Sequence, residues 1–242
     1  GGTDMKVVAV IPARYASSRF PGKPLADIKG KTMIQRIFEQ VRMCEDIDDV
    51  VIATDDPRIA DAARTFGAPA VMTSPECRSG TDRVAQAALG MAADAIINVQ
   101  GDQVVLDLAA LSRIAEELRL GCAMVTAATP AVPEEYGDPN CVKVVCDTRG
   151  YALYFSRASI PHARNALKTP VLKHIGIYGF SAETLARFTA LEPTPLETAE
   201  SLEQLRALEN GIPIKVIIAS GEFLEINTPQ DRERVLEAWQ DS

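Results

Sequence analysis

Three cations, Arg14, Arg19 and Lys23, lie within one short segment directly after an apolar run at Val7–Ile11. Small residues and prolines separate them, so the backbone can approach a ligand and the segment is stiff. Arginine forms forked hydrogen bonds with phosphate oxygens, lysine adds a compact charge, and free N–H groups cradle further oxygens. The pattern predicts a triphosphate-binding loop, with a solvated basic surface loop as the alternative.

A carboxylate follows a second apolar run. Ala95–Val99 has the character of a central strand, and Gln100, Gly101 and Asp102 come at its end. The carboxyl ends of parallel strands form the ligand crevice of an open sheet, so we expect Asp102 to lie beside the basic loop. The alternative is that Asp102 only caps a helix that begins near Asp107.

The elements that position these residues alternate between apolar runs and helical patterns. This alternation predicts an α/β fold with a mostly parallel sheet covered by helices on both faces. The strands expected in the first half are Val7–Ile11, Val50–Thr54, Ala70–Met72 and Ala95–Val99, and the helices are Thr32–Cys44, Ile59–Phe66 and Gly80–Ala92.

The second half of the chain is less regular. Expected strands are Val142–Val145, Ala152–Ser156, Ile175–Phe180 and Lys215–Ala219, with loops at Gly137–Cys141 and His162–Pro170. Expected helices are Ala182–Leu191, Leu196–Glu209 and Thr228–Trp239, the last capped by Thr228 and started by Pro229. No segment is rich enough in Pro, Gly or Ser to separate two domains, so we expect a single domain over residues 5–242.

Composition narrows the function. The chain has 242 residues and a net charge of −8, which argues against general nucleic-acid binding, so an anionic ligand must be drawn by a local basic patch. No apolar run reaches about 18 residues and no signal-peptide pattern is present, so we expect no membrane span and a cytoplasmic location. The five cysteines form no CxxC motif and are expected to be reduced, and a zinc site is not expected.

Several ordered blocks between Val7 and Val235 resemble the 3-deoxy-manno-octulosonate (Kdo) cytidylyltransferases, or CMP-Kdo synthetases. These blocks include IPARYASSRFPGKPL from residue 11, SGTDR from 79, NVQGD from 98, KHIGIYGF from 173 and LEQLRALE from 202. The resemblance implies a three-layer, Rossmann-like nucleotidyltransferase fold with a smaller sheet region used for dimerisation. It implies a homodimer in which residues 130–180 form the acceptor and dimerisation subregion.

The same resemblance implies that CMP is transferred from CTP to an acidic sugar, with release of pyrophosphate and dependence on Mg²⁺, in lipopolysaccharide biosynthesis. The matching triphosphate residues are Arg14, Arg19 and Lys23, and the matching strand-end pair is Gln100 and Asp102. Matches to the segment near cytosine and ribose are Arg78, Ser79, Gly80 and Thr81. Matches to the sugar-acid pocket are Arg157, His174, Tyr178, Glu203 and Gln204.

Nucleotidyl transfer is an in-line displacement at phosphorus, in which positioning and electrostatics do most of the work. Asp102 would hold Mg²⁺, which takes oxygen ligands and often only one or two carboxylates, while Arg19 and Lys23 would neutralise the departing pyrophosphate. The acceptor residues have simpler alternatives. His174 could be a core histidine, and Glu203 and Gln204 could belong to a solvated helix face.

Three departures from the family pattern fall in the acceptor half. Asn227 stands where the family usually has an aspartate that binds metal, so the expected metal ligands are Asp102 and Asn227. Gln103 and Val104 replace a common Glu-Pro pair, and the segment from Pro161 to His174 is short. The expected acceptor is Kdo or its 8-amino analogue. The alternatives are CMP transfer to a phosphonate, or a CTP-binding module without catalysis.

Overall fold

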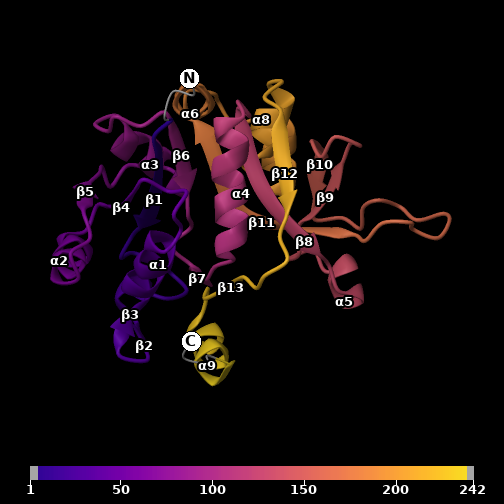
Figure 1. Cartoon of the computed structure of the whole chain (residues 1–242). Coiled ribbons are helices and arrows are strands. Elements are labelled where there is room, and N and C mark those ends of the chain that lie inside the picture. The colour runs from indigo at the N-terminus through magenta and orange to yellow at the C-terminus, as the bar shows by residue number, and fades with distance from the viewer. Residues whose placement is uncertain (1–4, 239–242) are drawn as a thin grey trace.

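The computed structural model describes residues 5–238, and Figure 1 shows their central sheet with helices packed around it. In this part of the chain nine strands join in that sheet. They are β1 (Val7–Ala13), β4 (Asp49–Thr54), β5 (Ala70–Met72), β6 (Ala95–Asn98), β8 (Met124–Pro130), β9 (Lys143–Cys146), β10 (Ala152–Ser156), β11 (Leu172–Ser181) and β12 (Ile214–Ile218). Two small antiparallel pairs lie outside it: β2 (Asp27–Ile28) with β3 (Lys31–Thr32), and β7 (Gln103–Val105) with β13 (Leu224–Glu225).

The main sheet is mostly parallel, as the alternating pattern predicts. Its strand order is β10-β9-β11-β6-β1-β4-β5, and β8 and β12 continue from β11. Parallel pairs join β1 to β4 and β6, β4 to β5, and β8 to β12. Only β10 and β11 run against the common direction among these strands, because β11 pairs antiparallel with β6, β8 and β9.

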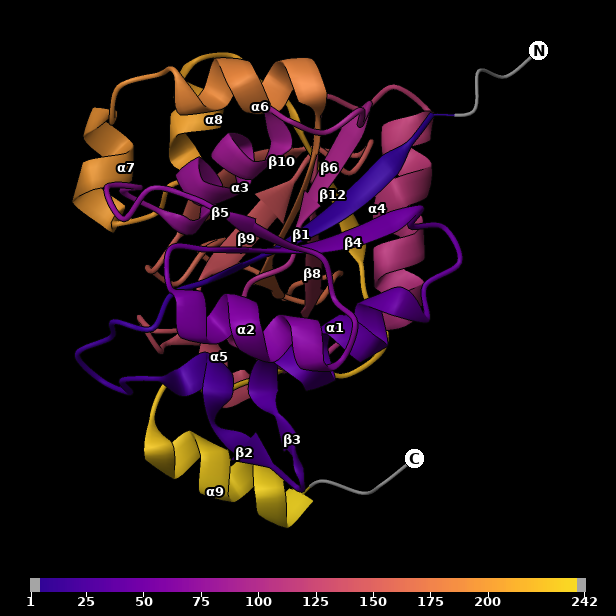
Figure 2. The same cartoon turned by 90° about the vertical axis from the view of Figure 1, so that its left-hand side faces the viewer.

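The helices form two outer layers, and alternation along β1 shows why. Val7, Ala9 and Ile11 face one apolar core, while Val8 and Val10 face the other. Figure 2 shows helices on both sides of the sheet. The first core is covered by α1 (Met33–Arg42), α2 (Pro57–Thr65), α4 (Leu108–Arg119) and α9 (Pro229–Ala238), and the second by α3 (Gly80–Ala88), α6 (Ala182–Thr189) and α8 (Leu205–Glu209). The three-layer prediction is confirmed.

The remaining helices are short: η1 (Lys23–Leu25), a 3₁₀ turn, α5 (Pro133–Tyr136) and α7 (Pro195–Glu200). The expected single helix over Leu196–Glu209 is wrong, because α7 and α8 are separate. The chain turns between them at Ser201, whose φ of 52° lies in the left-handed region. Glu209, at the end of α8, explains the break. Its carboxylate accepts from the N–H groups of Leu196 and Glu197, so α8 folds back against the start of α7.

Other helix and strand boundaries differ from the expected ones by a few residues, and one strand was not expected. Strand β8 was not expected, because its MVTAATP sequence is small and only weakly apolar, although its first five residues are buried. The expected cap of the last helix is confirmed, since Thr228 Oγ1 accepts from the N–H of Asp231 at 3.1 Å. Its expected end at Trp239 lies outside the described residues. Within the described residues, no helix is long and apolar enough to span a bilayer.

Candidate nucleotide site

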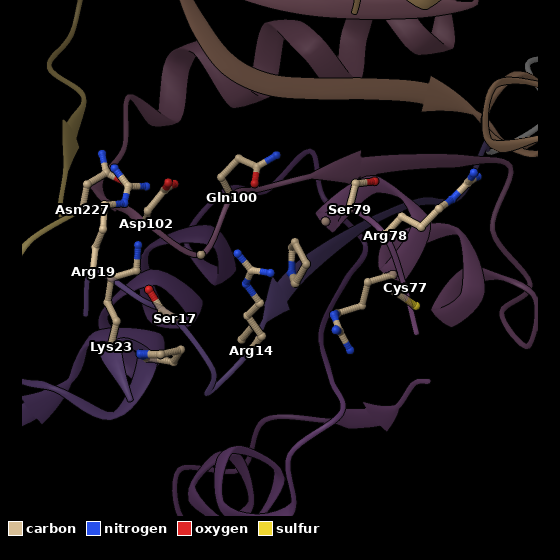
Figure 3. Close-up of a pocket in the computed structure, with 16 residues that line it drawn as sticks. Arg14, Ser17, Arg19, Lys23, Cys77, Arg78, Ser79, Gln100, Asp102 and Asn227 are labelled. Carbon is tan, nitrogen blue, oxygen red and sulfur yellow. The ribbon is translucent and has the colours of Figure 1, made fainter. Parts of the chain in front are cut away.

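Four segments from distant parts of the sequence surround one cavity of about 260 Å³ at the carboxyl end of the parallel strands. They are the loop after β1, the turn after β6, the start of α3 and the segment between β13 and α9. In Figure 3, Arg19, Lys23, Asp102 and Asn227 gather at one end, and Cys77, Arg78 and Ser79 at the other. The cavity is therefore elongated, with chemically different ends.

Hydrogen bonds within the basic loop fix its shape. The N–H of Gly22 donates to the carbonyl of Tyr15 at 2.9 Å, and the N–H of Phe20 donates to Ser17 Oγ at 3.3 Å. Gly22 has a φ of +70°, and a Cβ there would lie 3.1 Å from the Tyr15 ring. Glycine is required at this turn, which brings Lys23 back toward the cavity.

A second glycine sets the distance between β1 and the turn after β6. A Cβ on Gly101 would lie 2.6 Å from the carbonyl oxygen of Pro12, so the two backbones meet directly. This contact places the next residue, Asp102, beside the basic loop. The expected convergence of strand ends is confirmed, since both Asp102 and Lys23 line the cavity.

Asp102 and Lys23 influence each other electrostatically. Burial raises the pKa of Asp102, and the charges of Lys23 and Arg19 oppose that rise. Burial lowers the pKa of Lys23, and Asp102 opposes that change. Lys23 Nζ also donates to the carbonyl of Ile226 at 2.9 Å, which ties the loop to the segment before α9. Asp102 does not cap the next helix, because Asp107 Oδ1 accepts from the N–H of Ala110 at 3.1 Å.

The other end of the cavity is built on the first turn of α3. Ser79 caps this helix by accepting from the N–H of Asp82 at 3.1 Å, and Gly80 leaves the approach open. The positive end of the helix therefore faces the cavity, where an anion or an electronegative ring atom is stabilised. Thr81 is buried behind it and does not line the cavity.

The charge of the cavity suits a polyanion. Among the described residues that line it, one carboxylate, Asp102, faces five basic side chains: Arg14, Arg19, Lys23, Arg78 and Arg83. Arg83 was quoted in the SGTDR block but not expected to take part. It is buried, donates to Thr73 Oγ1 at 2.6 Å and pairs with Asp55 at 3.4 Å. Its spacing of four residues from Ser79 places both on one helix face, a signal present in the sequence.

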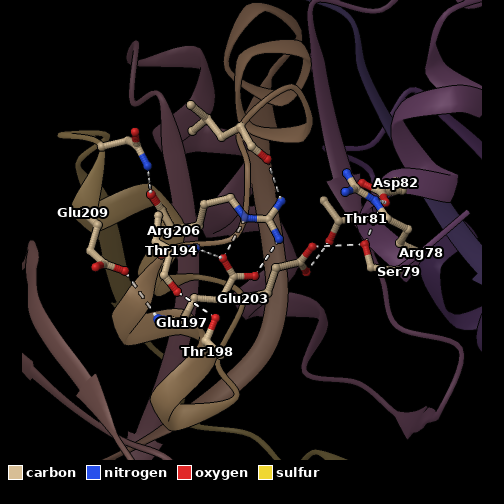
Figure 4. A network of polar contacts seen from close by, with 12 residues as sticks. Arg78, Ser79, Thr81, Asp82, Thr194, Glu197, Thr198, Glu203, Arg206 and Glu209 are labelled. Carbon is tan, nitrogen blue, oxygen red and sulfur yellow. Dashed lines mark hydrogen bonds and ion pairs between the residues drawn. The ribbon is translucent and has the colours of Figure 1, made fainter.

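Glu203 belongs to an adjoining cavity of about 450 Å³ that shares Arg78 and Ser79 with the first. Its carboxylate accepts from Ser79 Oγ at 3.0 Å and from Thr81 Oγ1 at 2.9 Å, as Figure 4 shows. The alternative of a solvated helix face is excluded for this residue. Burial raises the pKa of Glu203, and the two hydroxyl donors oppose that rise.

His174 and Tyr178 lie on β11, and neither lines either of the two cavities. His174 Nε2 is 3.0 Å from Thr126 Oγ1, and its ring meets Phe155 edge-on with centroids 5.0 Å apart. Burial lowers the pKa of His174 to about 3, so the ring is neutral at physiological pH. Burial, with a smaller contribution from Glu203, raises the pKa of Tyr178 well above its usual value. These contacts are those of a core histidine, and an acceptor role for either residue stays a prediction.

Two further residues predicted to bind the acceptor, Arg157 and Gln204, do not line these cavities. Arg157 Nε donates to the carbonyl of Glu200 at 2.8 Å, and its Nη1 donates to the carbonyl of Pro139 at 3.1 Å. Gln204 is buried at the start of α8. Neither lines the described cavities, and their acceptor role likewise stays a prediction.

Comparison with known proteins decides the family. Residues 8–217 match the family described as cytidylyltransferase. The chain is 47% identical over 245 residues to 3-deoxy-manno-octulosonate cytidylyltransferase of Syntrophotalea carbinolica, covering 96% of this chain and 97% of that protein. It is 48% identical to the protein of the same name from Myxococcus xanthus, covering 95% of each. The chain belongs to the 3-deoxy-manno-octulosonate cytidylyltransferase family.

The fold agrees with this family. A solved structure of CMP:2-keto-3-deoxy-manno-octonic acid synthetase complexed with CTP superimposes with a TM-score of 0.93 at 40% identity, covering 96% of this chain and 98% of that one. The protein is thus a CTP-dependent nucleotidyltransferase by family, and its central sheet and cavity have the nucleotidyltransferase architecture.

Two residues of the cavity could hold the divalent cation expected for a Kdo cytidylyltransferase. Asp102 and Asn227 both line the cavity and offer the oxygen donors that Mg²⁺ prefers. The described residues contain no group of three or more His, Cys, Asp or Glu side chains suited to a metal. This sparse donor set fits Mg²⁺, which commonly keeps several water and phosphate ligands. Glu225, which sequence patterns did not single out, lies beside Asn227, whose Nδ2 donates to Glu225 Oε2 at 3.4 Å.

Proposed function

We propose that the protein transfers CMP from CTP to Kdo and releases pyrophosphate. One observation carries the proposal: five basic side chains surround an elongated cavity whose only carboxylate among the described lining residues comes from a strand end. The named relatives act on the same sugar acid, and a relative in this family was solved with CTP. The geometry of the cavity and the similarity to these relatives therefore support the same reaction.

The proposed orientation of CTP follows from the two ends of the cavity. Arg19 and Lys23 bind the β- and γ-phosphates and stabilise the charge on the departing pyrophosphate. Ser79 and Gly80, at the start of α3, and the neighbouring Arg78 lie where the nucleoside is held. Arg14 and Gln100 stand between these groups in Figure 3, next to the position of the α-phosphate in this orientation.

We propose Mg²⁺ as the cofactor, with Asp102 and Asn227 as its protein ligands. When bound, such a cation neutralises phosphate charge and lowers the pKa of the attacking hydroxyl. Asp102 contributes a single negative charge, which the charge of Lys23 partly balances. The role of the chain is to hold oxygen donors at the phosphate end while the basic loop fixes the triphosphate.

The proposed acceptor site is the adjoining cavity, where Glu203 faces Arg78 and Arg206. Three carboxylates (Asp82, Glu197 and Glu203) and two guanidinium groups (Arg78 and Arg206) line this cavity. Arg78 pairs with Asp82 and Arg206 pairs with Glu197, so Glu203 is the carboxylate that suits the hydroxyl groups of a sugar ligand. Because Ser79 lines both cavities, an acceptor bound there lies next to the nucleotide. The expected acceptors remain Kdo and its 8-amino analogue, in lipopolysaccharide biosynthesis.

We place the protein in the cytoplasm, where CTP is available, and propose that it forms a homodimer. Support for the dimer comes from β10, an edge strand that exposes Leu153, and from Val132 and Leu167, two further exposed apolar residues of the same half of the chain. The segment between β10 and β11 extends well beyond the sheet in Figure 1. Light scattering after gel filtration would give twice the monomer mass if this proposal holds.

Pyrophosphate release with CTP and Mg²⁺ tests the function directly. The acceptor panel is Kdo, 8-amino-Kdo, a neuraminic acid and simple phosphonates, with Asn227→Asp in parallel. Turnover of Kdo or its analogue at about 1–10³ s⁻¹ supports the proposal. Activity with phosphonates alone overturns the acceptor, and CTP binding without turnover of any acceptor overturns catalysis.

A further inference from the structure

Glu225 lies in β13, next to the phosphate end of the cavity but outside its lining. Strands β13 and β7 pair antiparallel with Glu225 opposite Gln103, the residue after Asp102. Asn227 follows two residues later and lines the cavity with Asp102. The carbonyl of Ile226, between Glu225 and Asn227, accepts from Lys23 Nζ at 2.9 Å. Glu225, an exposed residue, is thus flanked on one side by groups of the phosphate end.

Two side-chain amides donate to this one carboxylate. Gln103 Nε2 is 3.4 Å from Glu225 Oε1, and Asn227 Nδ2 is 3.4 Å from Glu225 Oε2. An ionised carboxylate only accepts hydrogen bonds, so each amide must turn its nitrogen toward Glu225. The oxygen of a planar amide then points away from the carboxylate.

Gln103 shows how strongly Glu225 dictates this orientation. Its side chain is fully buried, and its Oε1 has no hydrogen-bond partner among the described residues. A buried carbonyl oxygen without a partner is unfavourable, yet the reversed amide would place oxygen against carboxylate. For Asn227, the same rule leaves Oδ1 available to a ligand in the cavity that Asn227 lines.

The charges of this group are coupled as well. The Asp102 and Glu225 carboxylates repel each other, and each is attracted to Lys23. Asp102 and the Asn227 amide line the cavity, and Glu225 adds a second carboxylate outside that lining, so a small divalent cation bound there relieves the repulsion between the two carboxylates. The neutral Asn227 supplies an oxygen, and Glu225 supplies the charge that Asn227 lacks.

We infer that Glu225 is a positioning residue of the divalent-cation site, which orients the Asn227 amide oxygen toward the cation and adds the second negative charge beside Asp102. This inference rests on the proposed Mg²⁺ requirement of the reaction. It assigns to the pair of Glu225 and Asn227 the work that one aspartate at position 227 would do alone.

The test measures Mn²⁺ binding in the presence of CTP, by the electron paramagnetic resonance signal of free Mn²⁺. Glu225→Gln should raise the Mn²⁺ dissociation constant about 10–100-fold, because groups that orient metal ligands contribute on this scale. Glu225→Asp, which keeps the charge, should lose less. Glu222→Gln is the matched control, since Glu222 is an exposed glutamate of the same segment, and it should bind Mn²⁺ like the wild type.

A double variant separates this role from a merely structural one. Glu225→Gln combined with Asn227→Asp moves the charge by two residues and should restore Mn²⁺ binding to within a few-fold of the wild type. A wild-type dissociation constant in Glu225→Gln, or an affinity in the double variant as low as in Glu225→Gln, overturns the inference. If the wild type itself binds no Mn²⁺ with CTP, the proposed cation site fails first and the inference fails with it. Thermal unfolding of each variant checks that it is folded.

Discussion

Single residues of the nucleotide site divide into those that are free to meet a ligand and those already used by the fold. Arg19 is exposed at the phosphate end, whereas Lys23 holds the Ile226 carbonyl and Arg83 holds Thr73 and Asp55. Replacing Arg19 should therefore affect the proposed ligand binding without disturbing the fold, while replacing Lys23 or Arg83 should also disturb the contacts that these side chains make. Arg19 is the cleaner probe of the triphosphate end.

Arg19→Ala should lower kcat/KM about 10²–10³-fold, the usual effect of removing one donor to charge that develops in the transition state. The free energy of unfolding should change by less than about 0.5 kcal/mol, since the side chain is exposed. Steady-state pyrophosphate release and urea unfolding measure the two quantities. Arg42→Ala, at an exposed position in the last turn of α1, removes the same charge far from the cavity and should leave kcat/KM unchanged. Equal losses in both variants would indicate a long-range field instead of direct binding.

Gly101 carries the second prediction at this scale. A Cβ there would lie 2.6 Å from the Pro12 carbonyl oxygen, closer than side-chain carbons approach, so Gly101→Ala must separate β1 from the turn before Asp102. We expect a loss of about 1–3 kcal/mol in the free energy of unfolding, as for other overpacked sites. Activity should fall with it.

Gly90→Ala is the control for that experiment, because a Cβ at Gly90 meets nothing within 4 Å. Denaturant unfolding should show it to be at least as stable as the wild type, since alanine restricts the unfolded chain. An unchanged Gly101→Ala would mean that the two backbones separate without difficulty.

The bounds of helices and strands can be predicted from the sequence where the pattern that determines them is local. The strand before the basic loop, the strand before Asp102 and the helix that Ser79 caps all have continuous apolar faces or capping residues in sequence. Because the ends of these strands meet at one edge of the sheet, the sequence alone predicts that Arg14, Arg19, Lys23 and Asp102 lie close together.

What escaped prediction depends on contacts between distant segments. The pairing of β13 with β7 puts Glu225 opposite Gln103, across 122 positions, and no local pattern signals it. The break between α7 and α8 depends on Glu209 folding back onto the start of α7. Apolar residues do not mark that break, because Leu202 in the turn and Leu205 at the start of α8 are both buried.

The α7–α8 pair depends on one buried ion pair. Arg206 Nη2 lies 2.5 Å from Glu197 Oε1 (Figure 4), and both side chains are almost buried. The guanidinium also lies over the Phe188 ring. Arg206→Met should reduce the free energy of unfolding by about 3–5 kcal/mol, because Glu197 is left as an uncompensated buried charge. Urea unfolding at pH 7.5 measures this loss.

A second substitution tests that explanation. In Arg206→Met with Glu197→Leu, no unpaired charge remains, so at least half of the lost stability should return. If the double variant is no more stable than Arg206→Met, the unpaired charge of Glu197 does not cause the loss, and the lost contact of Arg206 with Phe188 accounts for it. Glu203, which this turn presents to Ser79 and Thr81, should lose its position in the single variant.

The whole molecule is held together by β11, the antiparallel strand between its two halves. This strand pairs with β6 of the nucleotide half and with β8 and β9 of the second half. Its register shifts between Ile175 and Tyr178, and Thr126 on β8 lies at that irregularity, bonded to His174 and to the carbonyls of Ile175 and Ile177. A change in the charge of His174 therefore acts at the junction of the two halves.

Stability of the whole chain should consequently depend on pH through His174. Its pKa is about 3 in the folded protein, against an ordinary value of 6.5, so between these values the unfolded chain binds a proton that the folded chain does not. The free energy of unfolding must then fall as pH decreases from about 6.5 toward 3, by about 1–2 kcal/mol between pH 7.5 and pH 5 from this residue. Urea unfolding at the two pH values should show a larger loss for the wild type than for His174→Gln, whose amide still reaches Thr126 but does not titrate. The exposed His162→Gln should keep the wild-type difference, whereas equal losses in wild type and His174→Gln would place the acid sensitivity elsewhere.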